Sequence, residues 1–213
     1  MVGQHDHPRP QCLDLLRFYL YRLDGFLFLG AFMPKIVNPI EAQRALLQAA
    51  GSVLRRKGIG RLTFEAIAAE AGVSKGGVLH YFRTKQCILE ALVHASMEAF
   101  ERAVDTLAAE DSESAGAWTR AYLSVCAALG SDGQHSGYSI AWAHDPPLLA
   151  LVQKRYDAWN NRLRNDGIDP NVAYLVRLAA DGLWQADGLM LAPPEGQSRV
   201  ALLENLVALT RAP

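Results

Sequence analysis

Residues 63–85 read TFEAIAAEAGVSKGGVLHYFRTK, and this stretch carries the clearest local signals in the chain. Thr63 is placed to cap a short helix that ends at Ala71 and Gly72, and Ser74 is placed to cap a second one over residues 75–81. Two short helices joined by a turn that contains glycine form a helix-turn-helix unit. The second helix of such a unit lies in the major groove of DNA, so the stretch predicts a DNA-reading surface.

Helical patterns continue on both sides of this stretch. Before it, apolar residues at helical spacing predict a helix from Asn38 or Pro39 to Lys57, ended by Gly58. After it, a long helix begins at Lys85. Further helices, separated by glycine or proline, are predicted at about 115–129, 147–166, 171–190 and 197–211. No stretch alternates with a period of two residues, so we expect an all-α fold of about nine helices.

The composition excludes several classes of protein. The 213 residues are 50% hydrophobic and 20% charged, which is enough apolar material for a folded core and excludes global disorder. The three cysteines are an odd number and form no CxxC pair, so neither a zinc ribbon nor a disulfide framework is expected. We therefore expect a reduced, cytoplasmic protein without a metal site or a cofactor.

Charge is distributed unevenly along the chain, although the net charge is only −1. Residues 34–100 contain nine basic and five acidic side chains, whereas residues 101–213 contain nine basic and fourteen acidic ones. A nucleic-acid footprint needs Lys and Arg gathered locally, so the first of these segments is the one expected to meet DNA. Chance segregation of charge is the alternative explanation.

The segment before the first patterned helix has no clear structural signature. Residues 12–33 are rich in Leu, Phe and Tyr, but charged residues interrupt them and the longest apolar run, residues 25–33, is far short of the ~20 residues that a bilayer requires. Met33 is followed by the first well-patterned helix and resembles a fresh start. We expect residues 1–32 to be an accessory or mis-assigned extension, and we expect no membrane association.

The DNA-reading stretch resembles the DNA-binding region of the tetracycline-repressor (TetR) family of bacterial regulators. The resemblance covers about fifty residues: the helix from Asn38 to Lys57, then Ile67-Ala68, Ala71-Gly72-Val73-Ser74, Gly76, Tyr81-Phe82 and Lys85. The rest of the chain matches the family only in length and helical character. The resemblance implies a DNA-binding domain over residues 33–85 and a helical ligand-binding and dimerisation domain over residues 86–213.

The resemblance also implies roles for individual residues at the DNA interface. Thr63 and Ser74 would present hydroxyls and helix N-termini to phosphates, as Lys side chains also do. Lys75, Gly77 and His80 would face base edges, while Tyr81 and Lys85 would clamp the backbone. Gly76 and Gly77 cost helix propensity, which close approach to DNA would justify; a loose helix end is the alternative.

Other residues of the stretch are expected in the core. Leu79 occupies a position that is commonly Tyr in the family, and we expect it to pack inward. A small core that holds the two helices together is predicted from Ile67, Ala71, Val73, Val78 and Phe82.

The second half contains large aromatic side chains at helical spacing. Trp118, Tyr122 and Cys126 follow one another at intervals of four residues, and Tyr138 with Trp142 repeats the interval. Such residues can line a mostly apolar pocket for a small molecule, although ordinary core packing explains each of them singly. The full set of candidate ligand-binding residues is Trp118, Tyr122, Cys126, Tyr138, Trp142, Tyr156, Trp159 and Trp184.

The last two helices, at about 171–190 and 197–211, are too apolar for two helices that lie on a surface alone. They are similar to the family's dimer interface, a four-helix bundle across a two-fold axis. Packing of the same faces within one monomer is the alternative.

These patterns favour a homodimeric repressor that a small apolar or aromatic ligand releases from a palindromic DNA operator. The alternative is a helical small-molecule binding protein or enzyme without a DNA-binding role. Nucleophile-elbow, HExxH, P-loop and dinucleotide-binding patterns are all missing from the sequence, so we do not expect an enzyme. A membrane-associated regulator that uses residues 12–33 is a third possibility.

Overall fold

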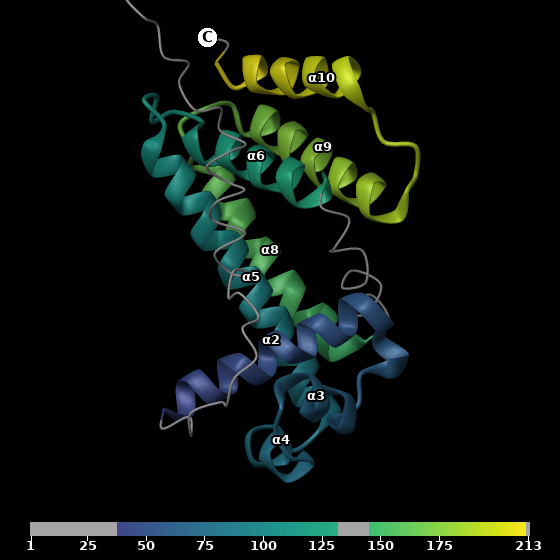
Figure 1. Cartoon of the computed structure of the whole chain (residues 1–213). Coiled ribbons are helices and arrows are strands. Elements are labelled where there is room, and N and C mark those ends of the chain that lie inside the picture. The colour runs from purple at the N-terminus through teal and green to yellow at the C-terminus, as the bar shows by residue number, and fades with distance from the viewer. Residues whose placement is uncertain (1–37, 132–144, 212–213) are drawn as a thin grey trace, which may run out of the picture. The chain divides into compact units, whose positions relative to one another are not determined.

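The computed structural model describes residues 38–131 and 145–211, and within these ranges it contains eight α-helices and no strand. The all-α prediction is therefore confirmed, with eight described helices against about nine expected. The helices are α2 (Pro39–Lys57), α3 (Phe64–Ala71), α4 (Lys75–Tyr81), α5 (Lys85–Glu110), α6 (Ala117–Ser131), α8 (Pro146–Arg164), α9 (Pro170–Leu189) and α10 (Gly196–Leu209), and a short 3₁₀ helix, η1 (Ile59–Arg61), links α2 to α3 (Figure 1).

The first four helices begin and end where the local chemistry predicts. Asn38 caps α2 through its side-chain oxygen, and Pro39 stands in the first turn, where its missing N–H costs nothing. Gly72 adopts the left-handed conformation (φ 66°) that ends α3 and starts the turn to α4. Thr84 caps α5, and only three residues, 82–84, lie between α4 and α5.

The first half of the chain is built around one apolar core, which we call the head core. Val53 and Leu54 of α2, Ile67 of α3 and Val78 of α4 are almost completely buried in it. The head core also takes in Ile88, Leu89, Leu92 and Val93 of α5 and, from much later in the chain, Leu148 and Val152 of α8. The start of α8 is therefore an integral part of the core that supports α3 and α4.

Helices α5 and α8 are joined by a ladder of ion pairs beyond the head core. Arg155 lies 2.9 Å from Glu101, and Arg162 lies 2.8 Å from Asp105. The Arg162 guanidinium also lies 4.7 Å from the centre of the Trp118 ring on α6, a favourable cation–π arrangement. These contacts link the C-terminal part of α8 to the C-terminal part of α5 and to α6.

Helices α6 and α9 make the most intimate contact in the second half (Figure 1). Gly130 allows this approach, because a Cβ atom there would lie only 2.1 Å from Oδ2 of Asp187 on α9. Asp166 holds the start of α6, since its carboxylate accepts hydrogen bonds from the backbone N–H groups of Trp118 and Thr119.

Two arginines bind the two ends of α10 to neighbouring helices. At its C-terminal end, buried Arg120 of α6 donates to Thr210 Oγ1 (3.2 Å) and pairs with Asp111 (2.7 Å). At its N-terminal end, Arg199 pairs with Asp187 (2.8 Å) and donates to the carbonyl of Ala127 (3.0 Å). Between these two points only Leu206 of α10 is buried, so most of its apolar side chains face away from its own chain.

No helix in the described residues is long and apolar enough to cross a membrane.

Candidate DNA interface and ligand site

Both helices of the helix-turn-helix unit begin with the predicted caps. Thr63 Oγ1 accepts a hydrogen bond from the Ala66 N–H, and Ser74 Oγ accepts one from the Gly77 N–H, each at 3.1 Å. Both residues are exposed. Each hydroxyl keeps its own proton, so it can still donate to an incoming phosphate oxygen.

The N-terminal part of α4 presents a small, polar surface. Lys75, Gly76 and His80 are exposed and Gly77 is half-buried. A Cβ atom at Gly76 would meet only Ser74 Oγ, at an ordinary 3.7 Å, so nothing within the fold requires glycine there. Because glycine has no side chain, the helix backbone at this position could approach DNA more closely.

Tyr81 and Leu79 of α4 differ in how far they are buried. Tyr81 is half-buried, with its ring edge-on to the His80 ring at 5.0 Å. Leu79 is 37% exposed, so the expectation that it packs inward is wrong. Val78 and Phe82 are one turn apart and fill the inward side of this short helix, and Leu79 follows Val78 by about 100° around the axis.

Val73, expected in the small core, is also 36% exposed and lies in the turn between α3 and α4. The other expected core residues are buried or, for Ala71, half-buried.

The two lysines of the predicted interface already have partners in the free protein. Lys75 Nζ lies 2.7 Å from Glu65 of α3, and this hydrogen bond lowers the pKa of the Glu65 carboxyl. Lys85 Nζ donates to the carbonyl of Ile59 at 2.8 Å and so ties the start of α5 to η1. Both pairs are exposed, and an ammonium group has three protons, so each lysine can also reach a phosphate or base.

A second basic feature lies beside Thr63. Lys57, Arg61, Thr63 and Ala66 line an open groove of about 540 Å³. Lys57 and Arg61 are exposed. Their neighbour Arg56 instead pairs with Glu70 of α3, whose carboxyl also accepts from Ser52. The groove thus places two cations next to the N-terminus of α3.

The structure brings together several of the predicted ligand-binding residues. The rings of Trp118, Tyr122 and Trp159, which are buried, and Tyr156, which is half-buried, form one aromatic cluster with Phe100 of α5. Neighbouring ring centres are 4.9–6.1 Å apart. Buried Cys126 is close to this cluster, because its thiol interacts with the Tyr122 hydroxyl. Trp184 is half-buried on α9, and Tyr138 and Trp142 lie outside the described residues.

A buried ion pair borders the aromatic cluster. The Tyr122 hydroxyl donates to Asp181 Oδ1 (2.6 Å), and Arg177 Nη1 donates to Asp181 Oδ2 (2.7 Å). Burial raises the pKa of the Asp181 carboxyl, although the Tyr122 hydrogen bond and the Arg177 charge act in the opposite direction. Burial likewise raises the pKa of the Tyr122 hydroxyl and of the Cys126 thiol.

Sequence reasoning missed three members of this site, namely Phe100, Arg177 and Asp181. Phe100 belongs to the apolar series of α5, and Arg177 and Asp181 are spaced as an i, i+4 ion pair in the middle of a largely apolar helix. That pair was the available signal. No group of His, Cys, Asp and Glu in the described part of the chain could hold a metal ion.

Two family models match the chain. "Bacterial regulatory proteins, tetR family" matches residues 46–92, and "Tetracyclin repressor-like, C-terminal domain" matches residues 116–211. Together they span both the helix-turn-helix unit and the helices that carry the aromatic cluster. No curated protein sequence matches the chain.

Solved structures with the same arrangement of helices include a TetR-family member (SCO1917) from Streptomyces coelicolor A3, 25% identical, which aligns with 79% of this chain and 98% of its own at a TM-score of 0.63. The multidrug binding protein EbrR complexed with ethidium is also 25% identical, with coverage of 81% and 99% and a TM-score of 0.59. A TetR-like transcriptional regulator from Rhodococcus sp. RHA1 is 20% identical, with coverage of 82% and 96% and a TM-score of 0.58.

Proposed function

Because the chain belongs to the tetracycline-repressor (TetR) family of transcriptional regulators, we propose that it is a cytoplasmic homodimer that represses transcription from a palindromic operator and releases it when a small molecule binds. In this proposal residues 33–85 bind DNA and residues 86–213 bind the ligand and the second subunit. Regulators of this family are generally not enzymes, and we infer the same of this chain.

The observation that carries the proposal is the surface at the start of α4. Two capped helix N-termini, at Thr63 and Ser74, present backbone N–H groups and hydroxyls that favour phosphate oxygens. Beyond Ser74, α4 exposes Lys75, Gly76 and His80, which are small or polar enough for a major groove about 12 Å wide. The groove of Lys57 and Arg61 adds positive charge beside the same surface.

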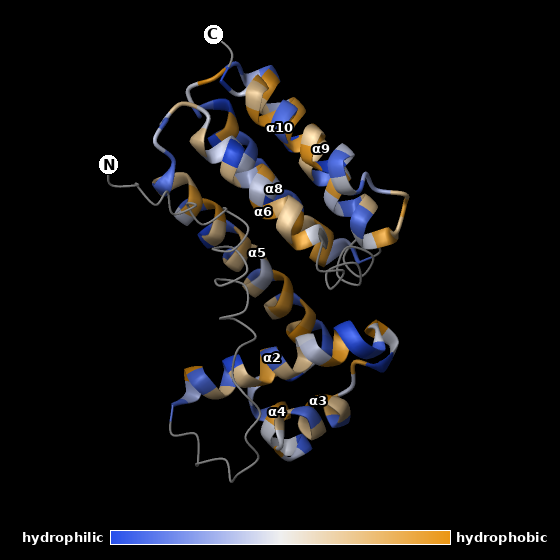
Figure 2. Cartoon of the chain, turned by 45° about the horizontal axis from the view of Figure 1, so that its top comes forward, coloured by the Kyte–Doolittle hydropathy of each residue, from blue (hydrophilic) through white to orange (hydrophobic). Residues whose placement is uncertain are grey.

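The apolar faces of α9 and α10 support a dimer. Leu175, Leu178 and Gly182 are exposed along one side of α9, and Val200, Leu202 and Leu209 are exposed on α10. Figure 2 shows the corresponding hydrophobic stretches along both helices and in the loop between them. Exposed apolar patches of this extent favour association with another protein surface.

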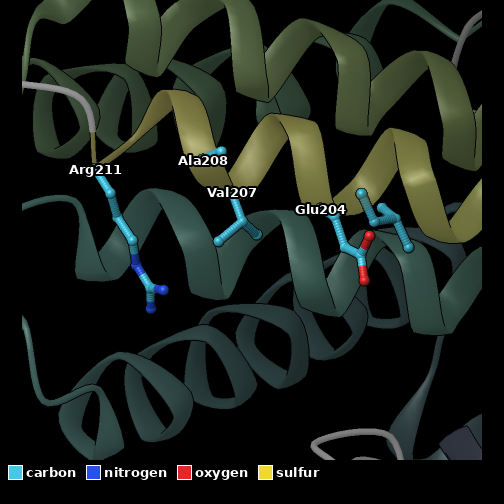
Figure 3. A pocket seen from close by; sticks show the side chains of 5 residues that line it. Glu204, Val207, Ala208 and Arg211 are labelled. Carbon is cyan, nitrogen blue, oxygen red and sulfur yellow. The ribbon is translucent and has the colours of Figure 1, made fainter.

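A groove on α10 belongs to the same candidate interface. It measures about 530 Å³ and is lined by Leu203, Glu204, Val207, Ala208 and Arg211. Glu204, Val207 and Arg211 point to the same side of the helix (Figure 3).

A two-fold dimer also fits the geometry of DNA, because its two recognition helices can meet successive major grooves about 34 Å apart.

The position of α8 supports coupling between ligand and DNA. Leu148 and Val152 belong to the head core, whereas Trp159, two turns further on, belongs to the aromatic cluster. A ligand that moves Trp159 therefore acts on a helix that also supports α4. Such a ligand releases DNA only if it binds more tightly to a conformation of the protein that has a lower affinity for DNA.

The test is a selection of genomic fragments by the purified full chain at moderate salt, followed by sequencing. Retention of a palindromic site is the expected result. His80→Ala should then change the preferred base at one position of each half-site, whereas His94→Ala, an exposed histidine of α5, should leave the selected sequence unchanged. A folded protein that retains no site would contradict the proposal and favour the alternative of a small-molecule binding protein without a DNA-binding role.

A further inference from the structure

Two buried N–H groups beside the aromatic cluster have no hydrogen-bond partner. They are Nε1 of Trp159 and Nε of Arg177. The one other buried side-chain atom without a partner in the described residues is Oδ1 of Asn160, which follows Trp159 by about 100° around α8. A buried donor without an acceptor costs free energy, and such groups are rare in folded proteins.

Both donors belong to side chains that lie close to one ring, that of Tyr156. The Trp159 ring centre is 5.1 Å from that of Tyr156, and the Arg177 guanidinium carbon is 5.6 Å from the same Tyr156 ring centre. Trp118 provides the contrast within the cluster, because its Nε1 donates to Asp105 at 3.0 Å. The cluster therefore contains one indole whose N–H is satisfied and one whose N–H is not.

The charges of the site are already balanced. Asp181 accepts hydrogen bonds from both Tyr122 and Arg177, so each of its carboxylate oxygens has a donor. A cationic ligand would find this carboxylate occupied and would lie near the Arg177 charge. What remains unused is donor capacity, which only an acceptor can satisfy.

We propose that the ligand of this chain is a flat aromatic molecule that carries an oxygen acceptor, either a carbonyl or a carboxylate, bound between Trp159 and Arg177. Its ring enters the aromatic cluster, where contacts between the ligand ring and the protein's rings replace some of the contacts among the protein's own rings. Its oxygen accepts from Trp159 Nε1 and Arg177 Nε. This ligand class rests on the proposed ligand-responsive function and makes it specific: neutral or anionic aromatic compounds bind, and aromatic cations do not.

The test uses probes that share one ring system and differ in the attached group. Isothermal titration calorimetry of the full chain compares 2-acetylnaphthalene and 2-naphthoate, which offer acceptors, with 2-(aminomethyl)naphthalene, which is a cation. We expect both acceptor probes to bind at least tenfold more tightly than the amine. Tighter binding of the amine, or no binding of any probe at millimolar concentration, would overturn the proposal.

Conservative variants test the two donors. Trp159→Phe keeps a ring and removes the N–H, and Arg177→Lys keeps the charge that pairs with Asp181 and removes Nε. Each should weaken the acceptor probes about 3- to 10-fold, the worth of one net hydrogen bond. The matched control is Trp118→Phe, whose lost N–H serves Asp105. Equal losses in Trp159→Phe and Trp118→Phe, with circular dichroism unchanged, would show that ring packing alone explains the binding.

Release of DNA is measured separately. Calorimetry requires no DNA, so probes that bind as expected to a protein that retains no genomic site would contradict the proposed function and leave the ligand class intact. A protein that retains a palindromic site but binds the amine more tightly than the acceptor probes would contradict the ligand class and leave the proposed function intact.

Discussion

Gly76 is the residue at which stability and DNA binding should diverge. Alanine fits there without a close contact, since its Cβ would lie 3.7 Å from Ser74 Oγ. We expect Gly76→Ala to raise the free energy of unfolding by about 0.5–1 kcal/mol, because alanine favours the helix and restricts the unfolded chain. We also expect weaker binding to the selected operator, because the methyl group would stand on the surface that approaches the bases in the proposed complex.

Chemical denaturation and a gel-shift titration measure the two effects in Gly76→Ala, with a scrambled DNA as the control for non-specific binding. A variant that is more stable and binds the operator as well as the parent would mean that the glycine is only a loose helix end.

Lys85 serves two partners in the proposal, and salt dependence separates them. Lys85→Ala removes both the hydrogen bond to the Ile59 carbonyl and the contact to phosphate. Loss of one phosphate contact should reduce the slope of log K against log salt by about 0.9. Lys154→Ala, which removes an exposed lysine of α8, is the control and should leave the slope unchanged. A weaker complex with the original slope would assign Lys85 a structural role only.

At the scale of elements, the loop 111–116 and the end of α10 depend on one buried arginine. Arg120 donates to Asp111 and to Thr210, and the hydrogen bond from Arg120 holds the pKa of the Asp111 carboxyl below its usual value. A carboxyl with a lowered pKa in the folded state stabilises that state above its unfolded pKa. This contribution is lost as the pH falls through the lowered pKa.

We therefore expect Asp111→Asn to lower the free energy of unfolding at pH 7 by about 2 kcal/mol, a typical contribution of a hydrogen bond to a charged group. The difference from the parent chain should shrink as the pH falls from 5 toward the lowered pKa of Asp111. Denaturation at a series of pH values measures this, with Asp157→Asn, an exposed carboxyl of α8, as the control. A difference that does not depend on pH would contradict the assigned role of the carboxylate.

Elements were predictable from sequence wherever a local signal defines their ends. Asn38, Thr63 and Ser74 are short polar side chains that cap a helix within three residues, so α2, α3 and α4 begin where expected. Leu79 and Val73 show the limit of such reasoning. Which side of a seven-residue helix faces inward depends on its tertiary packing against α3 and into the head core, and no local pattern encodes this.

The candidate ligand site was predictable only in part for the same reason. Spacing within one helix identified Trp118, Tyr122 and Cys126, and the abundance of aromatic residues identified Tyr156 and Trp159. Asp181 and Arg177 enter the site only because α9 packs closely against α6 at Gly130. A contact between residues 122 and 181 is a tertiary event, so the polar half of the site required the structure.

For the molecule as a whole, the proposed dimer should depend on the exposed face of α9. Gly182 is exposed, lies one helical turn from Leu178, and has open space where a side chain would begin, since no atom outside its own stretch of helix comes within 4 Å of that point. Gly182→Arg should therefore leave the monomer folded but place a charge in an apolar interface. We expect it to sediment as a monomer and to lose affinity for the palindromic site.

The control for Gly182→Arg is Gln153→Arg, which adds the same side chain to an exposed position of α8. Sedimentation of Gly182→Arg as a dimer, with its circular dichroism intact, would exclude this face of α9 as the interface.

Helix α8 limits how freely this protein could exchange parts with its relatives. Leu148 and Val152 are fully or almost fully buried in the head core, although they lie more than fifty residues beyond Val93, the last α5 residue in that core. A chimera that combines this chain's head with another regulator's second half inherits foreign side chains at both positions. Mismatched volumes in a close-packed core are costly. We therefore expect the proposed operator specificity to be transferable between such regulators only when the first two turns of α8 are inherited together with the head.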